Sequence, residues 1–387
     1  MFSEGGEPTR QSLLRFERER AEAGKFSLES SAYSVGICLK RFNMYNSIMK
    51  VLSGLSQQEI EEITGALNAS KYRARQIHNW IYLKSVSSID EMTDLSVKFR
   101  EELKQVAVVS DVRIKVKQVS SDGTIKYLLE YPDGECVETV LMRFDNRANL
   151  TACVSSQVGC AVNCSFCATG KRGFIRNLDY KEIIEQVLTI QRDTGLKVTN
   201  VVFMGQGEPL LNLDNVLKAM QIFNEDFQIG ARRLTVSTSG IIPQINRLAE
   251  LDMQSTLAIS LHASNHETRL KLMPIENKYN MDDLKKSLKN YVDKTGRRIT
   301  IEYLLIKGLN DTLESAKQLA NYLYDIKCNI NLIPYNPTAK NDYKRSSNEA
   351  ILKFKYLMEH SGKKVTVRLE RGGDIDAACG QLSGKTR

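Results

Sequence analysis

The composition of this 387-residue chain excludes fibrous and wholly disordered proteins, because 42% hydrophobic and 26% charged residues are typical of a globular protein with a large core. Lys and Arg outnumber Asp and Glu by 54 to 46, and the net charge of +8 is compatible with a polyanionic partner without requiring one. The chain has no apolar run long enough to cross a membrane, and its first residues, MFSEGGEPTR, do not resemble a secretory signal. We therefore expect a cytoplasmic protein.

The first 145 residues divide into three segments by their patterns. Residues 1–43 are polar and mix Glu with Arg (RFERERAEAGK), which predicts a flexible or partly helical extension. Residues 44–106 alternate helical stretches with polar breaks, which predicts a small helical accessory domain. Residues 107–145 have an apolar period of two with turn signals at 122–123 and 132–134, so we expect a short antiparallel β connector.

Residues 146–370 repeat a strand-then-helix pattern. The expected strands lie near residues 151–157, 198–204, 233–239, 256–262, 299–306 and 329–335. Such units form parallel sheets with right-handed crossovers, so the predicted fold is α/β, a partial (β/α)6 barrel, with a flat doubly wound sheet as the alternative. In both architectures ligands bind at the carboxyl ends of the strands. Residues 371–387 are expected to form a loop and tail.

Four of the eight cysteines lie between residues 153 and 167, which in a reducing compartment indicates metal binding or catalysis. Cys160, Cys164 and Cys167 follow the first expected strand with C-x3-C-x2-C spacing, and soft thiolates select iron–sulfur clusters or zinc. Three thiolates can each hold one iron of a cubane, which leaves the fourth iron open to S-adenosylmethionine (SAM). A closed zinc site that adds Cys153 as the fourth ligand is the alternative.

Further polar or glycine-rich segments stand at the ends of later strands. Gly207 and Glu208 lie in the run MGQGEP, where glycines allow close backbone approach and a carboxylate can accept a hydrogen bond from an ammonium group. The other strand ends carry Ser237, the run Ser260-Leu261-His262, and Asn336. Each could be a turn or cap alone, but their recurrence at successive strand ends favours a ligand site.

A single cysteine, Cys379, lies in the small-residue loop RGGDIDAACGQL near the C-terminus. Its reactivity would require a lowered thiol pKa, which Arg371 could assist and Asp374 and Asp376 would oppose. The residues themselves leave open whether Cys379 is a nucleophile or a buried small side chain.

Taken together, CVSSQVGCAVNCSFCATG, VVFMGQGEPLLNLDNV, LTVSTSG, ISLHA, NLIPYN and RGGDIDAACGQL resemble the RlmN family of radical SAM RNA methyltransferases, from Met44 to about Leu382. The resemblance implies that Cys160, Cys164 and Cys167 hold a [4Fe–4S] cluster. It implies a SAM site lined by Gly207, Glu208, Ser237, Ser260, Leu261, His262 and Asn336. Cys379 matches the cysteine that carries the methyl group, Cys153 the cysteine that resolves the covalent intermediate through a transient disulfide bond, and Glu138 the proposed proton acceptor.

The activity implied by the resemblance is methylation of adenosine C2 in 23S rRNA, at the peptidyl-transferase centre, and in tRNA, beside the anticodon. Two SAM molecules would be used per turnover, with an electron donor such as flavodoxin or ferredoxin, by a monomer. The alternatives are a Cfr-like C8 methyltransferase and a non-catalytic iron–sulfur protein that binds RNA. With RNA as the substrate, the basic residues of the helical domain at 44–106 make it a candidate RNA-binding unit. The basic candidates for phosphate contacts are Lys71, Arg73, Arg75, Lys171, Arg172, Arg176, Arg232, Arg233, Lys340, Lys344, Arg345, Lys385 and Arg387.

Overall fold

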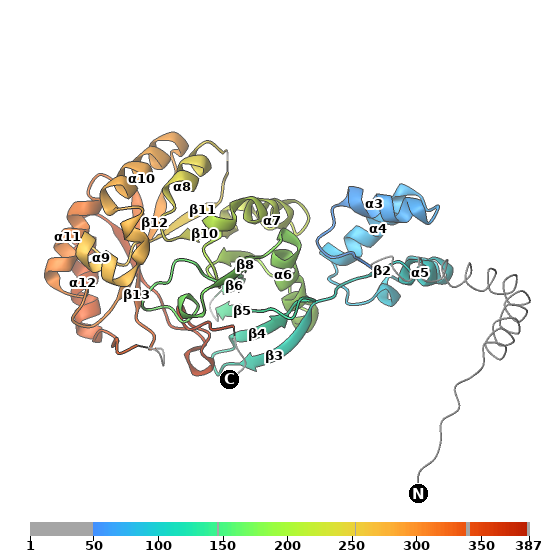
Figure 1. The fold of residues 1–387 in the computed structure, drawn as a ribbon, viewed down its shortest axis with the longest axis horizontal. Coiled ribbons are helices and arrows are strands. Elements are labelled where there is room, and N and C mark those ends of the chain that lie inside the picture. Colours follow the sequence, from blue (N-terminus) through green and yellow to red (C-terminus); the bar gives the residue numbers. More distant parts are fainter. Residues whose placement is uncertain (1–48, 145–146, 252, 338–340, 385–387) are drawn as a thin grey trace, which may run out of the picture.

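The computed structural model describes residues 49–144, 147–251, 253–337 and 341–384. The expected N-terminal extension at residues 1–43 and three of the basic candidates, Lys340, Lys385 and Arg387, lie outside the described residues. Figure 1 shows a large α/β unit with a small helical unit beside it.

The helical unit contains three α-helices and a short two-stranded sheet: β1 (Lys50–Val51), α3 (Gln57–Ala66), α4 (Lys71–Tyr82), α5 (Val97–Lys104) and β2 (Ala107–Val108). Helix α3 begins with a capping box, because the Ser56 hydroxyl accepts from the Glu59 N–H and the Glu59 side chain accepts from the Ser56 N–H. Apolar side chains of this unit belong to the same core cluster as those of the large unit. The two units therefore pack through a continuous hydrophobic core.

The large unit is built on one ten-stranded sheet. Its strands are β3 (Arg113–Val119), β4 (Ile125–Glu130), β5 (Cys136–Phe144), β6 (Arg147–Cys153), β9 (Asn200–Phe203), β10 (Leu234–Thr238), β11 (Thr256–Ser260), β12 (Ile299–Leu305), β13 (Cys328–Pro334) and β14 (Lys364–Val367). A separate antiparallel hairpin consists of β7 (Gln157–Gly159) and β8 (Phe174–Asn177).

Seven strands of the sheet are parallel and follow one another in chain order, β6, β9, β10, β11, β12, β13 and β14. A doubly wound sheet reverses its strand order at a switch point, whereas this order advances in one direction, as in a barrel. No pairing between described strands joins β14 to β6 or β3, so the barrel is partial. The predicted partial barrel is confirmed.

The helices between the parallel strands are α6 (Tyr180–Thr194), α7 (Leu213–Glu225), α8 (Ile242–Ala249), α9 (His266–Leu272), α10 (Met281–Thr295), α11 (Leu313–Leu323) and α12 (Asn348–His360). Figure 1 shows them around the outside of the curved sheet. Helix α6 illustrates how the sequence sets their limits: Asp179 forms an N-terminal capping box with Glu182, and Gly195 ends the helix in the left-handed region.

Three details differ from the sequence expectations. The first strand ends at Cys153 rather than 157, because the chain turns there and residues 157–159 pair with β8 instead. The run KVTV adds β14 as a seventh parallel strand. The expected antiparallel connector, with turns at Gly123 and Gly134, is continuous with the barrel sheet, because β5 pairs with β6.

Candidate active site

A cavity of about 810 Å³ lies within the partial barrel, which is within the usual size of a small-molecule site. Its lining comes from β5 and β6, the loop after β7, the next five parallel strands with the segments that follow their carboxyl ends, and residues 366–382. The amino-terminal ends of three of these strands also contribute, through Thr235, Thr256 and Thr300. Eleven residues singled out from the sequence reach it: Cys153, Cys160, Cys164, Cys167, Gly207, Glu208, Ser237, Ser260, His262, Asn336 and Cys379. The structure thus brings side chains from seven separate segments to one site.

The three-cysteine loop connects the two strands of the β7–β8 hairpin. Its backbone is held by Cys160 N–H, which donates to Gly173 O (3.0 Å), and by Ser165 N–H, which donates to Leu272 O (2.9 Å). Burial raises the pKa of Cys160 to about 12 and the pKa of Cys164 well above its usual value, and neighbouring thiols add to both shifts. These side chains therefore stay neutral unless a cation binds them.

The donor set suits an iron–sulfur cluster better than zinc. Cys160, Cys164 and Cys167 are free thiols that all line the cavity. The fourth ligand of the zinc alternative, Cys153, interacts electrostatically with Cys379 and Arg368 instead. Among the described residues, no three His, Cys, Asp or Glu side chains already form a metal site, so the three thiols would turn toward the ion on binding. Three thiolates without a fourth fit a cubane with one open iron.

The glycines of the MGQGEP run allow two backbone segments to pack together. A Cβ on Gly207, whose φ is 101°, would lie 2.6 Å from Gln157 Cβ. A Cβ on Gly205 would lie 2.7 Å from Val154 O. The packing lets Gln157 Oε1 accept from Glu208 N–H (2.9 Å). We expected these glycines to let the backbone approach a ligand closely. Gly205 and Gly207 do line the cavity, but the close contacts that require glycine are with the chain after β6.

Glu208 is buried at the cavity wall with its carboxylate already engaged. One oxygen accepts from Ser239 N–H (2.7 Å) and the other from Leu210 N–H (3.1 Å). Burial raises the pKa of Glu208, and the bond from Ser239 opposes that shift. Each carboxylate oxygen has two lone pairs, so Glu208 can still accept from an ammonium group in the cavity.

Next to it, the ends of β10 and β11 present Ser237 and Ser260, whose hydroxyls are 3.4 Å apart. His262 follows with φ of 56°, a conformation that Asn310 Nδ2 supports by donating to its carbonyl (2.8 Å). Burial lowers the pKa of His262 to about 3, so the imidazole is neutral. Its Nδ1 accepts from Leu304 N–H (3.1 Å), which places the proton on Nε2.

Two of the residues singled out do not line the cavity. Leu261 is fully buried, its side chain belongs to the hydrophobic core, and its N–H donates to Glu302 O (3.1 Å). Glu138, on β5, is also buried: its Oε1 lies 3.1 Å from Lys126 Nζ, and its Oε2 accepts from Gly384 N–H (2.6 Å). The C-terminal segment thus covers the carboxylate in this structure.

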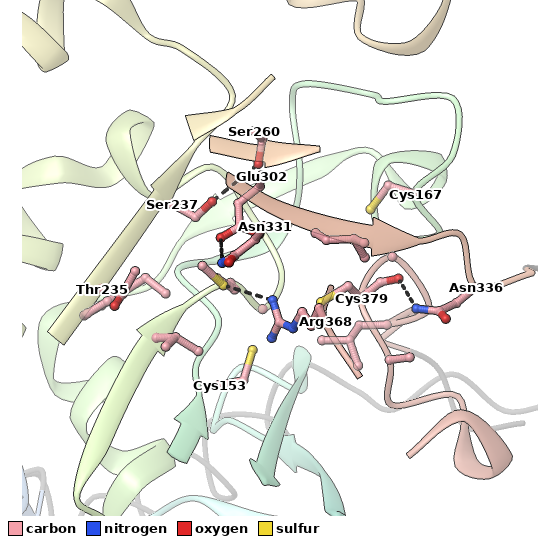
Figure 2. A pocket seen from close by; sticks show the side chains of 18 of the residues that line it. Cys153, Cys167, Thr235, Ser237, Ser260, Glu302, Asn331, Asn336, Arg368 and Cys379 are labelled. Atoms are coloured by element: carbon pink, nitrogen blue, oxygen red, sulfur yellow. Dashed lines mark hydrogen bonds between the residues drawn. The ribbon is translucent and has the colours of Figure 1, made fainter. Parts of the chain in front are cut away.

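Figure 2 shows the Arg368 side chain between Cys153 and Cys379. Its Nη1 donates to Met204 Sδ (3.6 Å), and an ionised Cys379 is the main cause that raises the pKa of Arg368. Burial raises the pKa of Cys153 to about 12, which Cys379 reinforces and Arg368 opposes. Arg371, the cation expected to assist Cys379, also lines the cavity, and its Nη1 lies 3.8 Å from Asp122 Oδ2. Arg368 was not predicted, although a charged residue directly after the strand-like run KVTV could have indicated it.

Glu302 is a second residue that sequence reasoning missed. It lines the cavity from β12, where its Oε1 accepts from Asn331 Nδ2 (2.9 Å) and its buried Oε2 has no hydrogen-bond partner among the described residues. Burial raises the pKa of this carboxyl group. A single carboxylate within the apolar strand ITIEYLL could have indicated a functional residue.

Several of the basic candidates are engaged in ion pairs. Arg172 pairs with Glu135 (2.7 Å), and Arg176 pairs with Asp133 (2.6 Å). The exposed basic candidates in the described part are Lys71, Arg75, Lys171, Arg232, Arg233, Lys344 and Arg345. No described helix combines the length and apolar character needed to cross a bilayer.

Comparison with known proteins places this site in a family. Residues 51–109 match the model described as the ribosomal RNA large subunit methyltransferase N-terminal domain, and residues 154–321 match the radical SAM superfamily. A crystal structure of a radical SAM methyltransferase from Sphaerobacter thermophilus is 42% identical with a TM-score of 0.82, covering 87% of this chain and all of that one.

Two curated relatives extend the match over most of the chain. The probable dual-specificity RNA methyltransferase RlmN of Alkaliphilus oremlandii is 45% identical over 86% of this chain and 97% of the relative. The protein of the same name from Thermoanaerobacter sp. (strain X514) is 46% identical over 88% of this chain and 98% of the relative. Identity at this level over nearly the whole of each relative shows that the chain belongs to the RlmN family of radical SAM proteins.

Proposed function

We propose that this protein is a radical SAM methyltransferase that methylates C2 of adenosine in 23S rRNA and in tRNA through an S-methylated Cys379. The single observation that carries the proposal is the convergence of Cys153, Cys379 and the three-cysteine loop on one cavity. The relatives that are named dual-specificity RNA methyltransferases support it. The proposal includes two SAM molecules per turnover, an external electron donor, a monomer and a cytoplasmic location.

Cys160, Cys164 and Cys167 would hold a [4Fe–4S] cluster, and Glu208, Ser237, Ser260, His262 and Asn336 line the space that SAM would occupy. When bound, the cluster and SAM supply a carbon radical that can take a hydrogen atom from an S-methyl group. The protein's contribution is to place a methylated sulfur, a base and a second thiol around one adenine. A splayed-out base is the usual substrate for such chemistry.

Cys379 first accepts a methyl group: its thiolate forms the new sulfur–carbon bond as the bond to the SAM sulfonium breaks. Arg368 stands beside this thiol. Once the carbon has joined adenine C2 and the ring has given up one electron, which the cluster would take back, Glu138 accepts the C2 proton; this requires the segment ending at Gly384 to release the carboxylate.

The Cys153 thiolate then forms a disulfide with Cys379 as the bond from Cys379 sulfur to the product carbon breaks; the electron pair of that bond stays with the carbon, which takes up a proton to become the methyl group. Figure 2 shows Cys153 and Cys379 on opposite sides of Arg368. A cation between two thiols favours the thiolate needed for this attack, which counteracts the burial of Cys153.

Iron binding tests the metal assignment. Anaerobically purified protein should contain about four irons, and Cys164→Ala should lose both the cluster and SAM cleavage, since three thiolates are the protein's full ligand set. Stoichiometric zinc without iron would support the structural zinc site. An intact cluster that yields no 5′-deoxyadenosine from SAM and dithionite would support a non-catalytic RNA-binding protein.

A pair of variants distinguishes the roles of the two catalytic cysteines. Cys153→Ala should accumulate as a covalent RNA adduct, because nothing resolves the link to Cys379, whereas Cys379→Ala should form none. Denaturing gels of protein isolated after anaerobic turnover measure this difference, with Cys328→Ala as a matched control, because Cys328 is buried and does not line the cavity. Equal behaviour of the two variants would contradict the roles, and nucleoside mass spectrometry distinguishes C2 from C8 methylation.

A further inference from the structure

Lys126 lies beside the proposed base on the neighbouring strand. On the antiparallel pair β4–β5, Lys126 is opposite Val140, so Lys126 and Glu138 are diagonal neighbours on one face of the sheet. Lys126 Nζ is 3.1 Å from Glu138 Oε1, and the two side chains are only 10% and 4% exposed. Separating the two groups would leave two uncompensated buried charges, which is costly. The ion pair therefore holds both side chains in place.

The same ammonium group also contacts the loop that carries Cys379. Lys126 Nζ donates to Asp376 O (3.2 Å), three residues before the cysteine, where the chain has a φ of 52°. The start of that loop is fixed to the adjacent β-turn, because Gly372 N–H donates to Asp122 Oδ2 (3.0 Å). One lysine therefore connects Glu138 to the Cys379 loop.

The two oxygens of Glu138 are held by partners of different kinds. Oε1 is bound by Lys126, which is part of the sheet, and Oε2 by Gly384 N–H, which belongs to the chain end. Thr169 Oγ1 donates to Leu382 O (2.6 Å) and Arg172 Nη1 to Gly384 O (3.3 Å), so side-chain bonds hold this end over Glu138. When the end moves away, Oε2 becomes free while Oε1 stays bound.

We propose that Lys126 is a positioning residue that fixes Glu138 relative to the Cys379 loop, so that Glu138 Oε2 faces the C2–H bond of the Cys379-linked adenine. This inference rests on the proposed function. In the step concerned, the C2–H bond breaks, the proton goes to Glu138 Oε2, and the bonding pair stays in the purine ring. Lys126 acts only through Glu138 and takes no part in this proton transfer.

The test compares Lys126→Met, which keeps the length of the side chain but removes its charge and both contacts, with Lys126→Arg, which keeps the charge. Lys115→Met is the control, because Lys115 forms a cross-strand ion pair with Glu130 in the same sheet (2.8 Å) whereas Lys126 binds Glu138 and the Cys379 loop. Four quantities are measured: methylation of Cys379 by intact mass, decay of the covalent RNA adduct, the isotope effect on that decay with C2-deuterated adenosine, and hydrogen exchange of residues 371–384.

In Lys126→Met we expect Cys379 methylation to be unchanged and adduct decay to slow about 100-fold, the loss typical of a base misplaced by about 1 Å. The isotope effect on adduct decay should increase, because proton removal becomes the slow step. Lys126→Arg should recover most of the rate, and Lys115→Met should behave as the parent protein. Hydrogen exchange of residues 371–384 should increase in Lys126→Met alone, which reports the lost loop contact without any turnover.

Parent-like adduct decay in Lys126→Met would overturn the inference, as would an equal loss of Cys379 methylation, which would indicate a general effect on the fold. If Lys126→Met does not fold, Lys126→Gln keeps a hydrogen-bond donor without the charge, and the same increase in isotope effect is expected. Failure of the proposed function is separately visible: Cys153→Ala would then give no adduct, or Glu138→Gln would resolve its adduct normally.

Discussion

Gly207→Ala should destabilise both the fold and the SAM site, because two separate effects act at this position. The backbone has a φ of 101°, which side-chain-bearing residues rarely adopt. The new Cβ would also lie 2.6 Å from Gln157 Cβ and 2.8 Å from Gln157 N, closer than real contacts allow. Since Gln157 Oε1 holds the Glu208 N–H (2.9 Å), any relief of the overlap displaces Glu208.

The size of the effect follows from these two contributions. Strained backbone costs about 1–3 kcal/mol and overpacking another 1–3 kcal/mol, so the free energy of unfolding should fall by about 2–6 kcal/mol. Gly195→Ala is the matched control, because Gly195 has a φ of 65° but no described atom lies within 4 Å of its Cβ position. It should lose only the backbone contribution, about 1–2 kcal/mol.

Urea unfolding followed by far-UV circular dichroism measures both variants, and equilibrium SAM binding to the reconstituted proteins measures the effect on the site. Gly207→Ala should bind SAM more weakly than the parent, whereas Gly195→Ala should bind it equally well. A loss of stability in Gly207→Ala no greater than in Gly195→Ala would refute the argument from close packing.

Two further predictions concern buried charges and thiols. Arg269→Met should reduce the free energy of unfolding by about 3–5 kcal/mol, because it leaves the fully buried Glu276 carboxylate without the Arg269 guanidinium. The control Arg247→Met breaks an exposed ion pair and should reduce it by at most about 1 kcal/mol. Equal urea midpoints of the two variants would contradict this prediction. Because the pKa of Cys153 is raised to about 12, its neutral thiol favours the folded state below the unfolded pKa, and this contribution should fall as pH rises from about 8.5 toward 12. Iodoacetamide should therefore modify Cys153 far more slowly than a free thiol at pH 8, as measured by peptide mass spectrometry. Arg368→Met should slow the modification further. Faster modification in that variant would show that Arg368 does not favour the Cys153 thiolate.

The sequence by itself determined the features that depend on local patterns. Alternating strands and helices predicted the partial barrel, and the turn signals at 122–123 and 132–134 predicted the antiparallel strands, because chain direction and side-chain period are set by neighbouring residues. The spacing of Cys160, Cys164 and Cys167 placed them in one loop for the same reason. Since the carboxyl ends of parallel strands meet at one edge, Ser237 and Ser260 could also be assigned to one site.

Only the tertiary structure decided which distant side chains meet. Arg368 comes between Cys153 and Cys379 because β14 joins the sheet as a seventh parallel strand, and a four-residue run gives little sign of its partner. Lys126 contacts Glu138 because of the β4–β5 register. It contacts Asp376, 250 residues further along the chain, because the C-terminal loop returns to this sheet. Such contacts are set by packing between segments remote in sequence, and no local pattern encodes them.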